Sequence, residues 1–380
     1  MLRNIDSTLN NAYTGKIIEF HILQNFPVSC LNRDEMGTPK TAIIGGVQRA
    51  RVSSQCWKRQ VRLEVHSLEK KSGNKIGIRT KHVEQKLKEA FHGLASDEDI
   101  TKFSTAVAKR IASENTLCFL SEGEIEAIKK LAINLKFQVP EGNETTKSEE
   151  KKNKGSKSKK DPFTAKLIDV LDKFRKQGLD ALDIALFGRM MAQAPEINVE
   201  AAASFSHAIS THESKTDFDF FTALDDYQEN ESAGSAHMGT LEFNSATYYR
   251  YISLDIGLLA ETLGLEGEGQ KENLKTAIKT FILALFKAVP NARQTTMSAA
   301  GTWDYAHIYL RHGQRIQASF EKPVKAKDGF LEPSIKELEN WLTEKKAMMG
   351  SLFPIDKEFI LGKNSNTSID TLIDGIMESL

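Results

Sequence analysis

The side chains best suited to catalysis lie in an acidic stretch in the middle of the chain. Residues 211–231 hold seven carboxylates and one lysine, a local net charge of −6. Aspartates there, with a nearby histidine, could hold Mg²⁺ for a phosphodiester reaction; the candidates are Asp217, Asp219, Asp225 and Asp226, with His212 or His237. Metal-dependent nucleases need acids fixed by a rigid core, whereas these lie near Gly and Ser in an expected projecting loop. The acidic stretch is therefore either the metal site of a nuclease or an acidic surface that faces solvent or a partner. We favour the acidic surface.

A basic stretch nearer the N-terminus offers the opposite chemistry. Residues 36–63 contain no Asp or Glu and have a local net charge of +6. The cations are Lys40, Arg49, Arg51, Lys58, Arg59 and Arg62. Because Lys and Arg, together with free N–H groups at a helix start, bind phosphates, this stretch predicts a polyanion site. The alternative is a solvated basic face.

The elements expected in this stretch place most of its cations together. Gly45 and Gly46, followed by alternating residues 47–52, predict a strand or hairpin arm with its arginines on one face. Ser53 is a good N-cap and predicts a helix that begins there. Side chains at positions i, i+3, i+4 and i+7 of that helix share one exposed stripe: Gln55, Lys58, Arg59 and Arg62. The term basic strip is used below for Arg49, Arg51, Ser53, Gln55, Lys58, Arg59 and Arg62.

Three apolar side chains stand in polar surroundings near the acidic stretch. They are Phe220, Phe221 and Met238. One interpretation is minor core packing, and the other is a set of wedges that insert between nucleobases.

The wider pattern predicts an α+β fold. Residues 16–24 and 240–255 predict buried strands, while 305–310 and 315–320 flank a Gly-containing turn and predict a hairpin. Amphipathic helices between about 65 and 195 predict a helical insertion. Within it, residues 141–161 are lysine-rich and nearly free of apolar side chains, which predicts a disordered loop.

Composition excludes several classes of protein. The chain has 380 residues, with 51 Lys+Arg against 51 Asp+Glu, and 40% of its residues are hydrophobic. Its three cysteines lack C-x-x-C spacing, so neither a disulfide scaffold nor a cysteine zinc site is expected. We find no Walker A, H-E-x-x-H or G-x-S-x-G motif, and expect no cofactor. Without a signal peptide or an apolar span, we expect a cytoplasmic protein with no membrane contact.

Several blocks of the sequence resemble one known family. They are residues 29–34 (SCLNRD), 45–46 (GG), 51–55 (RVSSQ), 183–190 (DIALFGRM), 208–212 (AISTH), 221–226 (FTALDD), 234–240 (GSAHMGT) and 325–331 (KAKDGFL). In this order they are similar to the CasC-type backbone subunit of the type I-E CRISPR Cascade complex. Residues before Lys16 and the lysine-rich loop look like additions to the family pattern.

The resemblance implies a fold and a domain plan. It implies an RRM-like (ferredoxin-like) palm, large helical fingers and a thumb hairpin. The palm would comprise residues 16–64, 196–210 and 241–380, the fingers 65–195 and the thumb 211–240, after an N-terminal extension at 1–15.

The resemblance also implies a noncatalytic role with RNA. Copies would polymerise head-to-tail in a filament along a CRISPR RNA and present its bases for pairing with target DNA. Further partners would be the large, small, 5′-end cap and RNA-processing Cascade subunits. The alternative remains a metal-dependent CRISPR RNA-processing nuclease that uses the aspartate cluster.

Residues are carried over by matching position. Contacts to the RNA would come from Arg33, Lys40, Ser53, Gln55, Lys58, Arg59 and Arg62, with Arg189 and Met190 where the RNA bends; the basic strip adds Arg49 and Arg51. Base wedging in the thumb would come from Phe220, Phe221, Thr222 and Met238. The charge asymmetry further suggests that Asp225 and Asp226 lie at the interface between copies and are not metal ligands.

Overall fold

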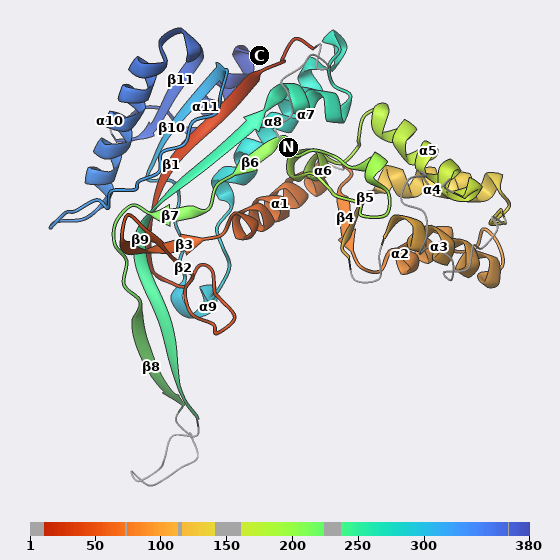
Figure 1. Cartoon of the computed structure of the whole chain (residues 1–380), viewed down its shortest axis with the longest axis horizontal. Coiled ribbons are helices and arrows are strands. Elements are labelled where there is room, and N and C mark those ends of the chain that lie inside the picture. Colours follow the sequence, from red (N-terminus) through yellow and green to blue (C-terminus); the bar gives the residue numbers. More distant parts are fainter. Residues whose placement is uncertain (1–10, 73, 113–115, 141–160, 224–236, 364) are drawn as a thin grey trace, which may run out of the picture. The chain divides into compact units, whose positions relative to one another are not determined.

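The computed structural model describes residues 11–72, 74–112, 116–140, 161–223, 237–363 and 365–380. The chain divides into two compact units (Figure 1). The sheet unit comprises residues 15–65, 203–256 and 275–380, and the helical unit comprises the described parts of 1–14, 66–202 and 257–274. The α+β class expected from the sequence is confirmed.

A large antiparallel sheet forms the centre of the sheet unit. Its strands run in the order β11-β10-β1-β9-β7-β3-β2, and β6 and β8 also pair with β9. The bounds are β1 Lys16–Ser29, β2 Thr41–Ile44, β3 Val47–Val52, β6 Ala203–Phe205, β7 Ala208–Ser210, β8 Asp217–Ala223, β9 His237–Asp255, β10 Tyr305–His312 and β11 Ile355–Gly362. Strand β1 lies between β10 and β9 and is largely buried on both faces, one apolar with Ile18, Phe20 and Ile22 and the other carrying Glu19 and His21.

Helices cover both faces of this sheet. On one face, Ile335, Leu338 and Leu342 of α10 (Leu331–Met349) pack against Tyr249 and Tyr305. On the other, Phe281 of α8 (Lys271–Lys287) meets Phe20 of β1 edge to face, with 6.4 Å between ring centroids. The remaining short elements of this part are α9 Gln294–Met297, η3 Gly350–Leu352 and α11 Ile369–Glu378.

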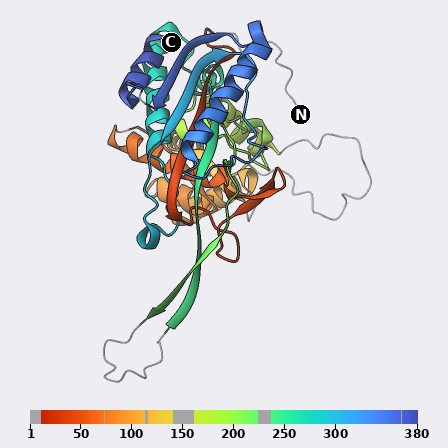
Figure 2. The ribbon, with the colours of Figure 1, turned by 90° about the vertical axis from the view of Figure 1, so that its left-hand side faces the viewer.

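Strand β9 is long enough to serve two structures. Its C-terminal part belongs to the sheet, whereas its first residues pair with β8 (Asp217–Ala223) in a hairpin that projects from the sheet (Figures 1 and 2). Asp217 and Asp219 lie on β8, two positions apart, and therefore share one of its faces.

The helical unit has its own aromatic core. Its elements are β4 Gly77–Thr80, α2 Val83–Phe91, α3 Asp97–Ile111, β5 Cys118–Ser121, α4 Glu122–Asn134, α5 Pro162–Lys176, α6 Leu182–Phe187, η1 Pro195–Ile197 and η2 Glu268–Gln270, with α7 at Ile256–Leu263. Phe91, Phe103 and Phe163 pack edge to face in its centre. Two of its helix starts are capped, since the Ser96 and Ser121 hydroxyls accept N–H groups of α3 and α4. Within the described residues, no helix is both long and apolar enough to cross a bilayer.

The hairpin expected at residues 305–320 is wrong in its second half. β10 pairs instead with β1 and β11, and residues 315–320 form no strand. Their N–H groups bond to side chains of the sheet, because Ile316 N–H donates to Glu19 and Ala318 N–H donates to the Tyr249 hydroxyl. Long-range side-chain acceptors therefore replace the local strand partner.

Candidate nucleic-acid interface

Helix α1 (Ser54–Lys71) carries the centre of the basic strip, as the sequence predicts. The Ser53 hydroxyl accepts the Cys56 N–H at 3.3 Å, so Ser53 caps the helix. Trp57 is buried against Phe26, and the guanidinium of Arg250 lies 3.5 Å from the Trp57 ring centroid. This anchored face leaves Gln55 and Arg59 exposed and Lys58 and Arg62 half-buried.

The β2–β3 hairpin brings two more cations to the start of α1. Its turn uses Gly45 and Gly46 at φ +62° and +78°, values that L side chains rarely adopt. Any Cβ at Gly45 would also stand 1.8 Å from the Glu321 carbonyl oxygen. After this turn the Arg51 N–H donates to the Lys40 carbonyl, which holds these two residues side by side.

The loop after β1 packs against the same helix start. Asn32 Oδ1 accepts the Ser53 N–H at 2.9 Å. The Asp34 carboxylate accepts from the Thr38 hydroxyl and from the N–H groups of Met36 and Thr38, and these bonds hold the pKa of Asp34 below its usual value. Asp34 therefore organises the loop that presents Arg33.

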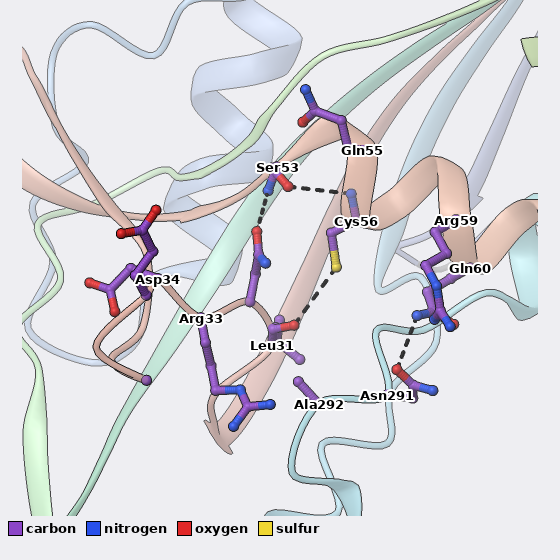
Figure 3. Close-up of a pocket in the computed structure, with 13 residues that line it drawn as sticks. Leu31, Arg33, Asp34, Ser53, Gln55, Cys56, Arg59, Gln60, Asn291 and Ala292 are labelled. Carbon is purple, nitrogen blue, oxygen red and sulfur yellow. Dashed lines mark hydrogen bonds between the residues drawn. The ribbon is translucent and has the colours of Figure 1, made fainter. Parts of the chain in front are cut away.

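A cavity of about 630 Å³ lies between this loop and the first turns of α1 (Figure 3). Its lining includes Arg33, Ser53, Gln55, Arg59, Gln60 and Asn291, and also the carboxylates of Asp34 and Glu35. Figure 3 shows Arg59 and Gln60 on one side of the Ser53–Cys56 turn and Asp34 on the other. Gln60 donates to Asn291 Oδ1 at 3.1 Å, which ties the segment after α8 to the cavity.

Two cations and two carboxylates line this cavity, and Asp34 is engaged within its own loop. Arg33 and Arg59 are exposed, and within the described chain neither guanidinium has a carboxylate within 4.0 Å. The Lys58 ammonium lies 5.8 Å from the Phe205 ring centroid, and burial lowers the pKa of Lys58. The Gln55 N–H in the first turn has no acceptor among the described residues. Cations beside an unused helix N–H suit a phosphate group.

His207 belongs to the same surface and was missed by the sequence reasoning. Its Nδ1 accepts the Ser54 N–H at 3.1 Å, so it helps to cap α1. Burial lowers the pKa of His207, and the cations Arg51 and Lys40 lower it further, which keeps the ring an acceptor near neutral pH. The β3–β7 pairing brings it there; no local sequence pattern signals that pairing.

The predicted phosphate contact by Arg49 is corrected by the structure. The sequence placed it in the basic strip beside Arg51, but its side chain is fully buried. Its guanidinium donates to the carbonyls of Ser210 at 2.6 Å, Phe320 at 2.9 Å and Glu321 at 3.2 Å. Because its guanidinium already donates to three backbone carbonyls, Arg49 connects β3 to neighbouring segments and is not placed to contact a phosphate.

Arg189 is likewise buried, whereas its neighbour is not. Its guanidinium donates to Glu124 at 2.5 Å and to the carbonyls of Phe119 and Ile197. The predicted RNA contact by Arg189 is corrected to a structural role in the helical unit. Met190, in contrast, is 75% exposed and remains available to a ligand.

The expected wedge residues lie on the projecting hairpin. Phe220 and Met238 are 63% and 62% exposed. Phe220 pairs with Thr240, and Thr222 pairs with Met238, so these side chains share one face of the hairpin. Phe218, which the sequence reasoning passed over, is on that face and 66% exposed. Phe221 is on the opposite face, where its ring lies against Gly239.

The acidic cluster shows no metal geometry in the part of the chain described. Within those residues no group of three His, Cys, Asp or Glu side chains is close enough to hold an ion. The His212 ring stacks on Phe330 with 3.7 Å between centroids, and its two nitrogens contact the Glu213 carbonyl and the Thr247 N–H. Asp225, Asp226, the loop at 141–160 and residues 1–10 lie outside the described residues.

A family model matches most of the chain, and solved structures share its fold. A family model described as CT1975-like protein matches residues 18–372. No curated protein matches the chain. A solved chain titled "CRISPR RNA-guided surveillance complex, pre-nicking" is 24% identical, with a TM-score of 0.75 over 96% of this chain and 99% of that chain. Another, titled "CRISPR RNA-guided surveillance complex", is 23% identical, with a TM-score of 0.58 over the same shares of the two chains.

Proposed function

Since the chain belongs to the CT1975-like protein family, we propose that it is a crRNA-binding subunit of a CRISPR RNA-guided surveillance complex. In the finer form of the proposal, it is a noncatalytic backbone subunit of the CasC type in a type I-E Cascade. Its sheet unit would act as an RRM-like palm, its helical unit as fingers and its β8–β9 hairpin as a thumb.

One observation carries the proposal. The cavity at the start of α1 combines two exposed guanidinium groups without carboxylate partners in the described chain, a capped helix start and an unused N–H. This arrangement binds the sugar-phosphate backbone and reads no base, which suits a subunit that leaves sequence recognition to base pairing.

The proposal includes self-assembly. Several copies would bind one CRISPR RNA head-to-tail, with the acidic hairpin end of one copy directed towards the basic surface of the next. Asp225 and Asp226 would then be interface residues. The Asp225→Asn/Asp226→Asn variant is expected to assemble poorly on RNA. Normal assembly together with loss of a Mg²⁺-dependent RNA cleavage would overturn this assignment and support the nuclease.

Sizing of the protein with and without RNA tests the function directly. Light scattering after gel filtration should show a mass that rises in steps of one subunit as the CRISPR RNA is lengthened. The same samples with Mg²⁺ or EDTA should contain intact RNA. A single subunit per RNA at every length, or RNA cut only with Mg²⁺, would contradict the proposal.

A further inference from the structure

A second, smaller cavity lies in the sheet unit, beside β6. Its volume is about 270 Å³. Ser204, Phe205 and Ser206 line one side, and Arg315, Gln317 and Tyr251 contribute to the rest. None of these residues was singled out by the sequence reasoning, and the cavity described above does not include them.

The hydroxyls of this cavity are arranged to donate hydrogen bonds. Ser204 Oγ accepts from Arg315 Nη1, and Ser206 Oγ accepts the Tyr251 N–H at 3.1 Å. Since each oxygen already accepts an N–H, its own proton is left for an outside acceptor. The Gln317 side chain, exposed like that of Arg315, adds two amide N–H donors and one acceptor oxygen. A lining rich in donors suits an anionic ligand.

The charge of the cavity also favours an anion. Among the described residues, no carboxylate lies within 4.0 Å of the Arg315 guanidinium. The nearby Glu19 is fully buried and already engaged. Its Oε1 accepts from the Tyr251 hydroxyl and from the Ile316 N–H, and its Oε2 accepts from Arg311 Nε. Arg311 therefore neutralises Glu19, and Arg315 keeps a net positive charge at the cavity.

One residue connects this cavity with the interface at α1. Phe205 lines the cavity, and the Lys58 ammonium lies 5.8 Å from its ring centroid. The Phe205 ring lies on the α8 face of the sheet, against Phe281, whereas Ser204 and Tyr251 are on the opposite face, so the two regions meet around β6. Because β6 pairs only with β9 among the described strands, a polyanion that passes from α1 around β6 would meet this donor-lined cavity next.

We propose that the cavity is a further phosphate subsite, in which Arg315, Ser204 and Ser206 hold one phosphodiester of the same RNA. This inference rests on the proposed function, because the RNA must first lie along α1. It adds contacts to the RNA backbone by residues that the sequence did not single out.

Binding of fluorescein-labelled single-stranded RNA to the full chain, measured by anisotropy against salt concentration, tests the subsite. Loss of one phosphate contact to a single strand should reduce the slope of log affinity against log salt by about 0.7 for Arg315→Ala. The loss of a charged hydrogen bond should weaken binding by about tenfold. Arg315→Lys should keep the wild-type slope, because it keeps the charge. Lys357→Ala, which removes an exposed cation from β11, is the matched control and should change neither quantity.

The outcomes separate this inference from the function on which it rests. If Arg315→Ala keeps the wild-type affinity and slope while Arg33→Ala/Arg59→Ala loses both, the subsite is refuted and the function stands. Failure of the wild-type chain to bind RNA refutes the function itself. Calorimetry with inorganic phosphate should show no tight binding; a tight signal that disappears in Arg315→Ala would identify a free-anion site and overturn the proposal.

Discussion

Removal of the two exposed arginines at the α1 cavity should change how RNA binding responds to salt. The perturbation is Arg33→Ala with Arg59→Ala. Both side chains line the cavity, and neither has a carboxylate within 4.0 Å in the described chain. Each arginine that contacts a phosphate therefore releases about one condensed counterion from the RNA. With a slope of about −0.7 per contact on a single strand, the variant's slope should be shallower by about 1.4. Between 50 and 200 mM salt, the wild type should then lose about sevenfold more affinity than the variant.

The assay is fluorescence anisotropy with a labelled single-stranded RNA at several salt concentrations. Lys336→Ala with Lys357→Ala is the matched control, because it removes two exposed cations from α10 and β11. The control should keep the wild-type slope. If the arginine variant and the control have the same slope as the wild type, the cavity faces only solvent and the reasoning is refuted.

Three further predictions concern the corrected and buried residues. In urea unfolding, Arg49→Ala should lower the free energy of unfolding by about 3 kcal/mol, because the buried carbonyls of Ser210 and Phe320 lose their donor. A decrease no larger than that caused by Arg51→Ala, at a half-buried position, would contradict this. Burial, helped by His307 and Arg311, lowers the pKa of His21 from 6.5 to about 3. Below pH 6.5 the unfolded chain binds a proton at His21 that the folded chain does not bind. The free energy of unfolding therefore keeps its full value above pH 6.5 and is lower by about 2 kcal/mol at pH 5. Wild type and His21→Gln should converge in stability as the pH falls, and parallel curves would refute the assignment. Arg189→Ala should destabilise the helical unit by about 3 kcal/mol or more, because it leaves the Glu124 carboxylate buried without its cation. Met190→Ala should instead leave the melting temperature unchanged and weaken RNA binding, and equal melting temperatures of the two variants would contradict these separate roles.

Elements with strong local signals could be predicted from the sequence. β1 follows from its apolar run, and α1 follows from the Ser53 cap and helical spacing. The segment at 315–320 could not be predicted, because its backbone bonds to Glu19 and Tyr249, which are distant in sequence. Local patterns report propensity and periodicity, whereas such side-chain acceptors depend on tertiary packing.

The candidate site was predicted in its centre but not at its edges. Gln55 and Arg59 are exposed along one stripe, as their spacing indicates. Arg49 and Arg51 share the same alternation, yet only Arg49 is covered by other segments, and no local signal distinguishes them. His207 and Asn291 reach the surface through long-range contacts, so they were missed.

The proposed function requires the RNA backbone to pass over the start of α1. Crosslinking of an assembled complex that contains 4-thiouridine RNA, followed by mass spectrometry of the peptides, locates the RNA directly. RNA that passes over this surface should crosslink to the loop at 31–40, to the start of α1 and to β6. Crosslinks confined to α10 and β11, with the loop and α1 unmodified, would contradict it.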